Sequence, residues 1–165
     1  RLTIGKKKYQ EFEEELKKVL EESEKLRQEL KELIIKDGES FTRVLDSLKL
    51  PQNTPEEQTR RLVAIQEAYK EAALVPLRTM EKSLEVLKLS RIVVEKGNVN
   101  TLSDAGASAL MAKGALEGAL LNVKINLKSI EDQTFASELK NKSEFILSES
   151  QRLKQEIDTL LQEKL

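Results

Sequence analysis

The chain of 165 residues is long enough for one domain around one core, and its 28 Lys and Arg nearly balance its 29 Asp and Glu. This balance argues against a nucleic-acid-binding protein, and the absence of Cys and His removes disulfides, thiol nucleophiles, zinc–thiolate sites and the commonest general base. Because no apolar run is long enough to span a membrane and no signal peptide is visible, we expect a cytoplasmic protein without membrane partners.

The first third of the chain predicts a basic cluster and two helices. Lys6, Lys7 and Lys8 follow Gly5, and an amphipathic helix is expected over residues 10–36. Its apolar positions recur at steps of three and four residues: Leu16, Val19, Leu20, Leu26, Leu30, Leu33 and Ile34. Asp37-Gly38 predicts a break, and a shorter helix is expected over residues 39–49.

The remainder of the chain predicts further helices with clear boundaries. Thr54, Pro55 and Glu57 form a capping-box start for a helix that runs to about Leu74. Pro76 predicts a kink or short break, and the helix after it ends at Gly97. The last helix is expected over residues 135–163, with Phe145 among the apolar positions that suit docking. No segment alternates as a half-buried strand does, so we predict an all-α fold, an antiparallel bundle of five to seven helices.

The helix expected within residues 97–130 has an unusual composition. Thr101, Ser103 and Asp104 are residue types that cap helix starts, and ten of the next residues are small, three of them glycines. They are Ala105, Gly106, Ala107, Ser108, Ala109, Ala112, Gly114, Ala115, Gly118 and Ala119. Each glycine costs about 1 kcal/mol against Ala in a helix. We therefore expect another backbone, or a flat ligand, to approach this helix closely.

The polar residues of this central helix are arranged along one side. Asp104 and Asn122 are separated by five full turns and point the same way, and Asn126 lies about 40° from that direction. The helical rise nevertheless separates Asp104 from Asn122 by roughly 27 Å. One helix cannot bring both residues to one small ligand, but helices that cross in antiparallel fashion in a two-fold dimer can. The pattern therefore predicts a homodimer.

Four segments, in this order, resemble a known family: LTIGKKKY at 2–9, VPLRTME at 75–81, GNVNTLSDAGASAL at 97–110 and EGALLNVKINL at 117–127. Over nearly its whole length the chain is similar to the cyclodeaminase/cyclohydrolase family of folate enzymes. The resemblance implies an all-helical dimer, with residues 1–165 forming a single domain. Family members usually begin with a Gly-rich loop and an Ala-rich helix that lead into the first segment, so we expect this domain to be N-terminally incomplete relative to the family.

The resemblance implies one of two reactions on a tetrahydrofolate derivative, and neither needs a metal or a redox cofactor. In one, 5-formiminotetrahydrofolate cyclises to 5,10-methenyltetrahydrofolate and ammonia leaves. In the other, water opens the methenyl bridge to the formyl form. Both require proton transfer at nitrogen and a fixed ring geometry. Asp104, a carboxylate at a helix start, is the catalytic candidate; the alternative is that it only caps the helix.

The same resemblance suggests which residues bind the substrate. Asn122 and Asn126 can read the amide and amino edge of the pterin, or they form a polar contact between helices. Asn98 and Asn100 are also binding candidates, unless they only accommodate a turn.

The basic cluster gives the last candidates. Lys6 and Lys8 can bind the anionic glutamate tail of folate, or they form a solvated patch. The alternative for the whole chain is a non-catalytic helical interaction module, in which the small residues serve helix packing alone.

Overall fold

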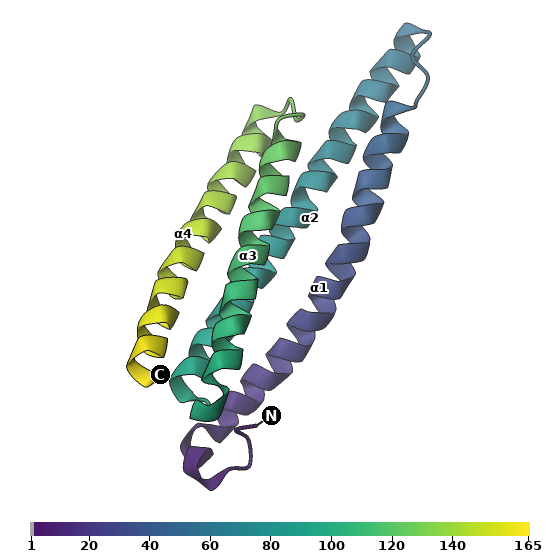
Figure 1. Cartoon of the computed structure of the whole chain (residues 1–165). Coiled ribbons are helices and arrows are strands. Elements are labelled where there is room, and N and C mark those ends of the chain that lie inside the picture. Colours follow the sequence, from purple (N-terminus) through teal and green to yellow (C-terminus); the bar gives the residue numbers. More distant parts are fainter. Residues whose placement is uncertain (1) are drawn as a thin grey trace.

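The computed structural model describes residues 2–165 and consists of four long helices that run alternately up and down (Figure 1). These are α1 (Glu13–Leu48), α2 (Pro55–Lys96), α3 (Leu102–Leu127) and α4 (Gln133–Lys164). Two short 3-10 helices, η1 (Lys7–Phe12) and η2 (Val99–Thr101), precede α1 and α3. No strand occurs among the described residues. The all-α antiparallel prediction is confirmed, but the predicted number of five to seven helices is wrong.

The first discrepancy is the expected break at Asp37-Gly38, which does not occur. α1 continues through Gly38 to Leu48. Both sides of this point are anchored, because Leu33 before it and Val44 after it are buried. A glycine in a helix interior costs about 1 kcal/mol, which burial of a single large apolar side chain exceeds. Packing against α2 therefore overrides the local breaking signal.

The second discrepancy is at Pro76, where α2 also continues without a break. Proline has no backbone N–H, so it cannot bond the carbonyl of Ala72 one turn earlier. In this structure Asn126 of α3 donates its Nδ2 to that carbonyl at 2.9 Å. Because a side chain from the neighbouring helix replaces the missing donor, the helix can pass through the proline.

The predicted helix boundaries are largely confirmed. Thr54 and Glu57 form the expected capping box with Pro55 in the first turn of α2. Gly97 ends α2, and a Cβ atom there would lie 2.4 Å from the Val93 carbonyl oxygen, so no larger residue fits without a shift. Asp132 caps α4 by accepting from the Phe135 N–H at 3.1 Å. The hydrogen bond from Lys70 at 2.6 Å lowers the pKa of the Asp132 carboxyl.

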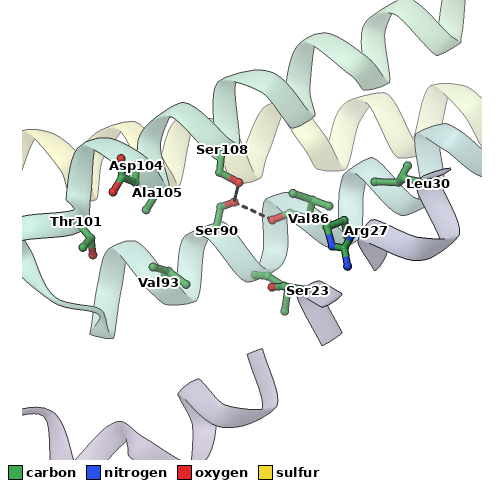
Figure 2. Close-up of a pocket in the computed structure, with 11 residues that line it drawn as sticks. Ser23, Arg27, Leu30, Val86, Ser90, Val93, Thr101, Asp104, Ala105 and Ser108 are labelled. Carbon is green, nitrogen blue, oxygen red and sulfur yellow. Dashed lines mark hydrogen bonds between the residues drawn. The ribbon is translucent and has the colours of Figure 1, made fainter. Parts of the chain in front are cut away.

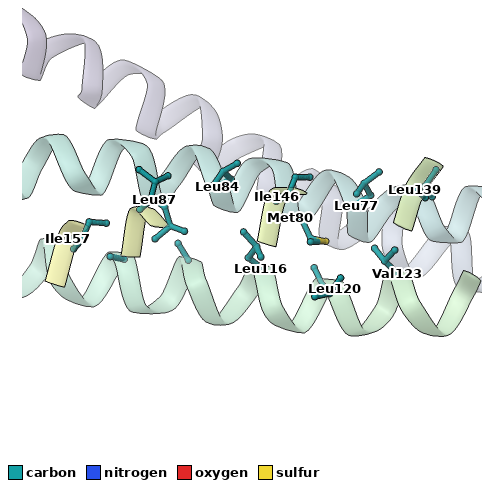
Figure 3. Packing of buried hydrophobic residues seen from close by; sticks show 14 of the residues in the cluster. Leu77, Met80, Leu84, Leu87, Leu116, Leu120, Val123, Leu139, Ile146 and Ile157 are labelled. Carbon is teal, nitrogen blue, oxygen red and sulfur yellow. The ribbon is translucent and has the colours of Figure 1, made fainter. Parts of the chain in front are cut away.

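The core forms around α2, which packs against α1, α3 and α4, while α3 also packs against α4. Figure 3 shows the large side chains that interlock between α2, α3 and α4. Met80, Leu87, Leu116, Val123 and Ile157 are fully buried there. Some apolar positions expected to dock are instead exposed: Ile34 is 74% exposed and Phe145 65% exposed. None of the described helices is both long enough and apolar enough to span a membrane.

Candidate functional site

A groove runs along the bundle between α1 and α3, with α2 as its floor. Four cavities of about 440, 480, 390 and 360 Å³ follow one another along it, and neighbouring cavities share lining residues. Leu30 of α1 and Ala115 of α3 lie on opposite walls of the middle of the groove. The groove exists because α1 and α3 both pack on α2 but make few contacts with each other. Each cavity is within the size range of small-molecule sites.

Asp104 lies at one end of this groove, in the first turn of α3 (Figure 2). Arg27 of α1 and Ser108 of α3 line the same cavity. Ser108 is bonded to Ser90 of α2 at 3.1 Å, and Ser90 also donates to the Val86 carbonyl at 2.9 Å. This end of the groove thus combines a carboxylate, a guanidinium and the hydroxyls of Ser23, Ser90, Thr101 and Ser108 on an apolar lining.

The Asp104 carboxylate makes no hydrogen bond or ion pair with any residue that the structure describes. Thr101 is the N-cap residue of α3, and no side chain donates or accepts a capping hydrogen bond there. The hydroxyl of Thr101 is instead bonded to the Asn98 carbonyl at 2.8 Å. Asp104 still benefits from the helix dipole, which favours an acid in the first turn. Its oxygens remain available to a molecule in the groove.

Asn122 and Asn126 lie at the other end of the groove. Both line a cavity with Asp37, Ser40 and Tyr69. Asn122 is exposed and makes no hydrogen bond within the described chain, whereas the amide of Asn126 donates to α2 as described above. Asn126 thus makes the polar contact between helices that was one of its two expected roles. Both asparagines still border the groove.

Asn98 holds the N-terminal segment against the turn between α2 and α3. Its backbone N–H donates to Thr3 Oγ1 at 3.0 Å, and its Nδ2 donates to the Leu2 carbonyl at 3.2 Å. Its Oδ1 accepts from the Asn100 N–H at 3.1 Å and from the Tyr9 hydroxyl at 3.4 Å. The side chain is buried, and both its nitrogen and its oxygen take part in these contacts, which we call the N-terminal clasp.

The N-terminal clasp determines where Lys6 and Lys8 lie. Both lysines are exposed and sit beside the α2–α3 turn, outside the groove cavities. A second contact secures this region: Lys96 donates to both Glu15 oxygens at 2.8 Å, and this hydrogen bond raises the pKa of Lys96. The lysines thus present positive charge at the end of the molecule nearest Asp104.

Within one chain, the structure does not bring the seven predicted site residues together. Asp104 borders the cavities at one end of the groove and Asn122 and Asn126 those at the other. Lys6, Lys8, Asn98 and Asn100 border none of these cavities. The structure adds Arg27, Asp37 and Tyr69 to the groove walls, and the sequence analysis missed all three. Arg27 and Asp37 lie among many charged residues of α1, so no local pattern distinguishes them from a solvated face.

Comparison with known proteins shows which family this helical chain belongs to. A family profile described as formiminotransferase-cyclodeaminase matches residues 1–145. The chain belongs to this family. A methenyltetrahydrofolate cyclohydrolase from Methylorubrum extorquens is 45% identical over 164 residues, which cover 99% of this chain and 79% of that protein. The formimidoyltransferase-cyclodeaminase of Rattus norvegicus is 29% identical over 149 residues, covering 90% of this chain but 28% of that longer protein.

The fold of the formiminotransferase-cyclodeaminase family is also found by structural comparison. The crystal structure of formiminotetrahydrofolate cyclodeaminase from Thermotoga maritima matches with a TM-score of 0.87 and 28% sequence identity. The match covers 98% of this chain and 76% of that chain. The resemblance drawn from the four sequence segments is therefore confirmed.

The N-terminal clasp yields a prediction about Asn98. Replacing Asn98 with Ala removes partners from the Leu2 carbonyl, the Asn100 N–H and the Tyr9 hydroxyl. We expect the variant to lose about 1–3 kcal/mol of unfolding free energy, the usual cost of unpaired buried polar groups. Amide hydrogen exchange should accelerate in residues 2–12 and little elsewhere. Asn100→Ala is the control, since its side chain is exposed and makes no hydrogen bond with a described residue. Equal effects of the two substitutions would contradict the role of Asn98.

Proposed function

We propose that the chain is a folate one-carbon enzyme. It hydrolyses 5,10-methenyltetrahydrofolate to the formyl form, or it cyclises 5-formiminotetrahydrofolate to the methenyl form with release of ammonia. The observation that carries this proposal is the 45% identity over 99% of the chain with a methenyltetrahydrofolate cyclohydrolase. Cyclisation is the second candidate, because a formiminotetrahydrofolate cyclodeaminase shares the fold with a TM-score of 0.87. A non-catalytic helical module is not favoured, since these relatives are named as enzymes.

Both reactions need a proton carrier beside one carbon atom. In the hydrolysis, water adds to the methenyl carbon between N5 and N10 and gives up one proton. The resulting hydroxyl then loses its proton as N5 is protonated and the bond from the carbon to N5 breaks, which leaves the formyl group on N10. In the cyclisation, N10 attacks the formimino carbon and loses its proton, and the departing nitrogen is protonated before ammonia leaves. Asp104 is our candidate for this carrier, because its carboxylate borders the groove without an ion-pair partner in the described chain.

The remaining candidates are assigned by their chemistry and position. Asn122 and Asn126 offer amide groups to the pterin at their end of the groove. Lys6 and Lys8 offer positive charge to the glutamate tail, and Asn98 and Asn100 belong to the turn that holds this basic segment. In this proposal residues 1–165 form a single domain of the family. The cytoplasmic location remains a prediction.

A homodimer would bring the two ends of the groove together. The exposed side of α3 carries Leu110, Met111, Leu121 and Ile125, each more than 60% exposed. On the same helix, a Cβ atom added at Gly114 or Gly118 would meet no atom within 4 Å. An antiparallel second α3 on this side would place Asp104 of one copy near the Asn122 end of the other. We propose that assembly.

The dimer proposal predicts the behaviour of a single substitution. Gly118→Glu adds a charged side chain to the exposed stripe of α3, and it improves helix propensity, so the protomer should stay folded. We expect light scattering to give a dimer for the unmodified protein and a monomer for this variant at tens of micromolar. Gly38→Glu is the matched control, because Gly38 is equally open but lies on α1. A monomeric unmodified protein, or a dimer that tolerates Gly118→Glu, would refute the proposed interface.

The catalytic proposal is tested with both substrates and with Asp104→Asn. We expect turnover of methenyl- or formiminotetrahydrofolate by the unmodified chain, and roughly a 10²- to 10⁴-fold lower kcat for the variant. Its melting temperature should hardly change, because the Asp104 side chain makes no hydrogen bond in the described structure. The control is Asp46→Asn, because Asp46 is an exposed carboxylate on α1 that pairs with Lys49 and with no other residue that the structure describes. Full activity of Asp104→Asn would remove Asp104 from the mechanism, and absence of turnover of both folates would reject the enzyme proposal.

A further inference from the structure

The hydrogen bond between Asn126 of α3 and the Ala72 carbonyl of α2 fixes one side chain of the groove. Ala72 is buried, with 6% of its surface exposed, so its carbonyl cannot readily turn to water. Pro76 removes the N–H that would bond this carbonyl in a regular helix. The Asn126 Nδ2 supplies the donor at 2.9 Å from a position 54 residues away in the chain. Leaving a buried carbonyl unpaired costs folding free energy. The bonded arrangement is therefore strongly favoured over one in which the Ala72 carbonyl has no donor.

The same hydrogen bond determines the orientation of the Asn126 amide. A carbonyl oxygen can only accept, so the amide nitrogen and not Oδ1 must face Ala72. The planar amide then directs Oδ1 away from the Ala72 carbonyl. Oδ1 makes no hydrogen bond with a described residue, while Asn126 lines the cavity at the Asn122 end of the groove. Asn126 therefore keeps one oriented acceptor, Oδ1, that is free for a molecule in this cavity.

We propose that Pro76 is a positioning residue, which acts by leaving the Ala72 carbonyl for Asn126 and so fixes Oδ1 of Asn126 as an acceptor toward the bound ligand. This inference rests on the proposed folate function for the identity of the ligand. A pterin edge carries both donors, a ring N–H and an amino group, and an acceptor, the ring carbonyl. Oδ1 pairs with one of the donors, so Asn126 selects the N–H and amino side of the ring.

The hydrogen bond itself is tested by a double-mutant cycle in denaturant. In the unmodified protein, Asn126→Ala leaves the Ala72 carbonyl unpaired, and we expect the unfolding equilibrium constant to rise about 5- to 150-fold. In a Pro76→Ala background the new Ala N–H bonds that carbonyl, so Asn126→Ala should have little effect. Asn122→Ala, one turn away and without a hydrogen bond in the described chain, should show no such dependence on residue 76. Equal effects of Asn126→Ala in both backgrounds would overturn the coupling.

The orientation is tested by kinetics on whichever of the two folates the unmodified enzyme turns over. Pro76→Ala frees the Asn126 amide to rotate, and we expect KM to rise about 2- to 10-fold with little change in kcat. Pro51→Ala, a proline in the exposed loop before α2, should leave KM unchanged. An unaltered KM for Pro76→Ala would show that the proline does not position the amide for the ligand.

The acceptor role is tested with an isosteric carboxylate. Asn126→Asp places an oxygen against the Ala72 carbonyl in the unmodified background, and KM should rise. In the Pro76→Ala background that carbonyl is already bonded, so the Asp oxygen is free to accept from the pterin. The double variant should therefore recover a lower KM than Asn126→Leu in the same background. If Asp is no better than Leu there, the ligand is read through the amide nitrogen and the proposal is overturned.

The identity of the ligand and the coupling between Pro76 and Asn126 can be refuted separately. An unmodified chain that neither binds nor converts either folate rejects the proposed function and, with it, the pterin as ligand. The unfolding cycle does not use a ligand, so it still decides whether Pro76 and Asn126 are coupled.

Discussion

The structure depends on the ability of α2 to bury side chains against three neighbours at once. Its buried residues extend over most of its length, from Ala68 to Val94, and include small ones such as Ala73 and Ser83 as well as Met80 and Leu87. Small residues let neighbouring helices approach closely, and large ones fill the spaces between them. α1, α3 and α4 are thereby held by one common helix, and α3 and α4 also support each other.

The groove is a direct consequence of this arrangement. α1 and α3 rest on the same helix without closing on each other, so apolar walls remain open between them. The exposed side of α3 adds Gly114 and Gly118, where an added Cβ atom would meet no atom of the described residues within 4 Å, although each helical glycine reduces stability. A fold selected only for the stability of the isolated chain has little reason to keep these residues. They are consistent with a function that requires a second helix or a ligand on this side.

The polar residues proposed for the site differ in how far the isolated chain uses them. Asn98 holds the N-terminal clasp with both ends of its amide, and Asn126 uses its amide nitrogen to bond the carbonyl that Pro76 leaves without a donor in α2. Asp104 and Asn122, in contrast, have no partner in the described chain. Asn126 shows that a residue can be structural and still border a site with a free acceptor. Asp104 and Asn122 show where hydrogen-bonding capacity is left for a substrate or a second chain.

The sequence by itself determined the helical class, most helix boundaries and the family, because these depend on local patterns. A few consecutive residues determine each of these boundaries: the capping box at Thr54, the end of α2 at Gly97 and the cap at Asp132. Only the tertiary structure decided whether Gly38 and Pro76 break their helices, since the answer depends on burial of Leu33 and Val44 and on a donor from Asn126, remote in sequence. It likewise decided which apolar faces stay open and which charged residues of α1, such as Arg27, border the groove. These features arise from packing between helices, and no local pattern encodes them.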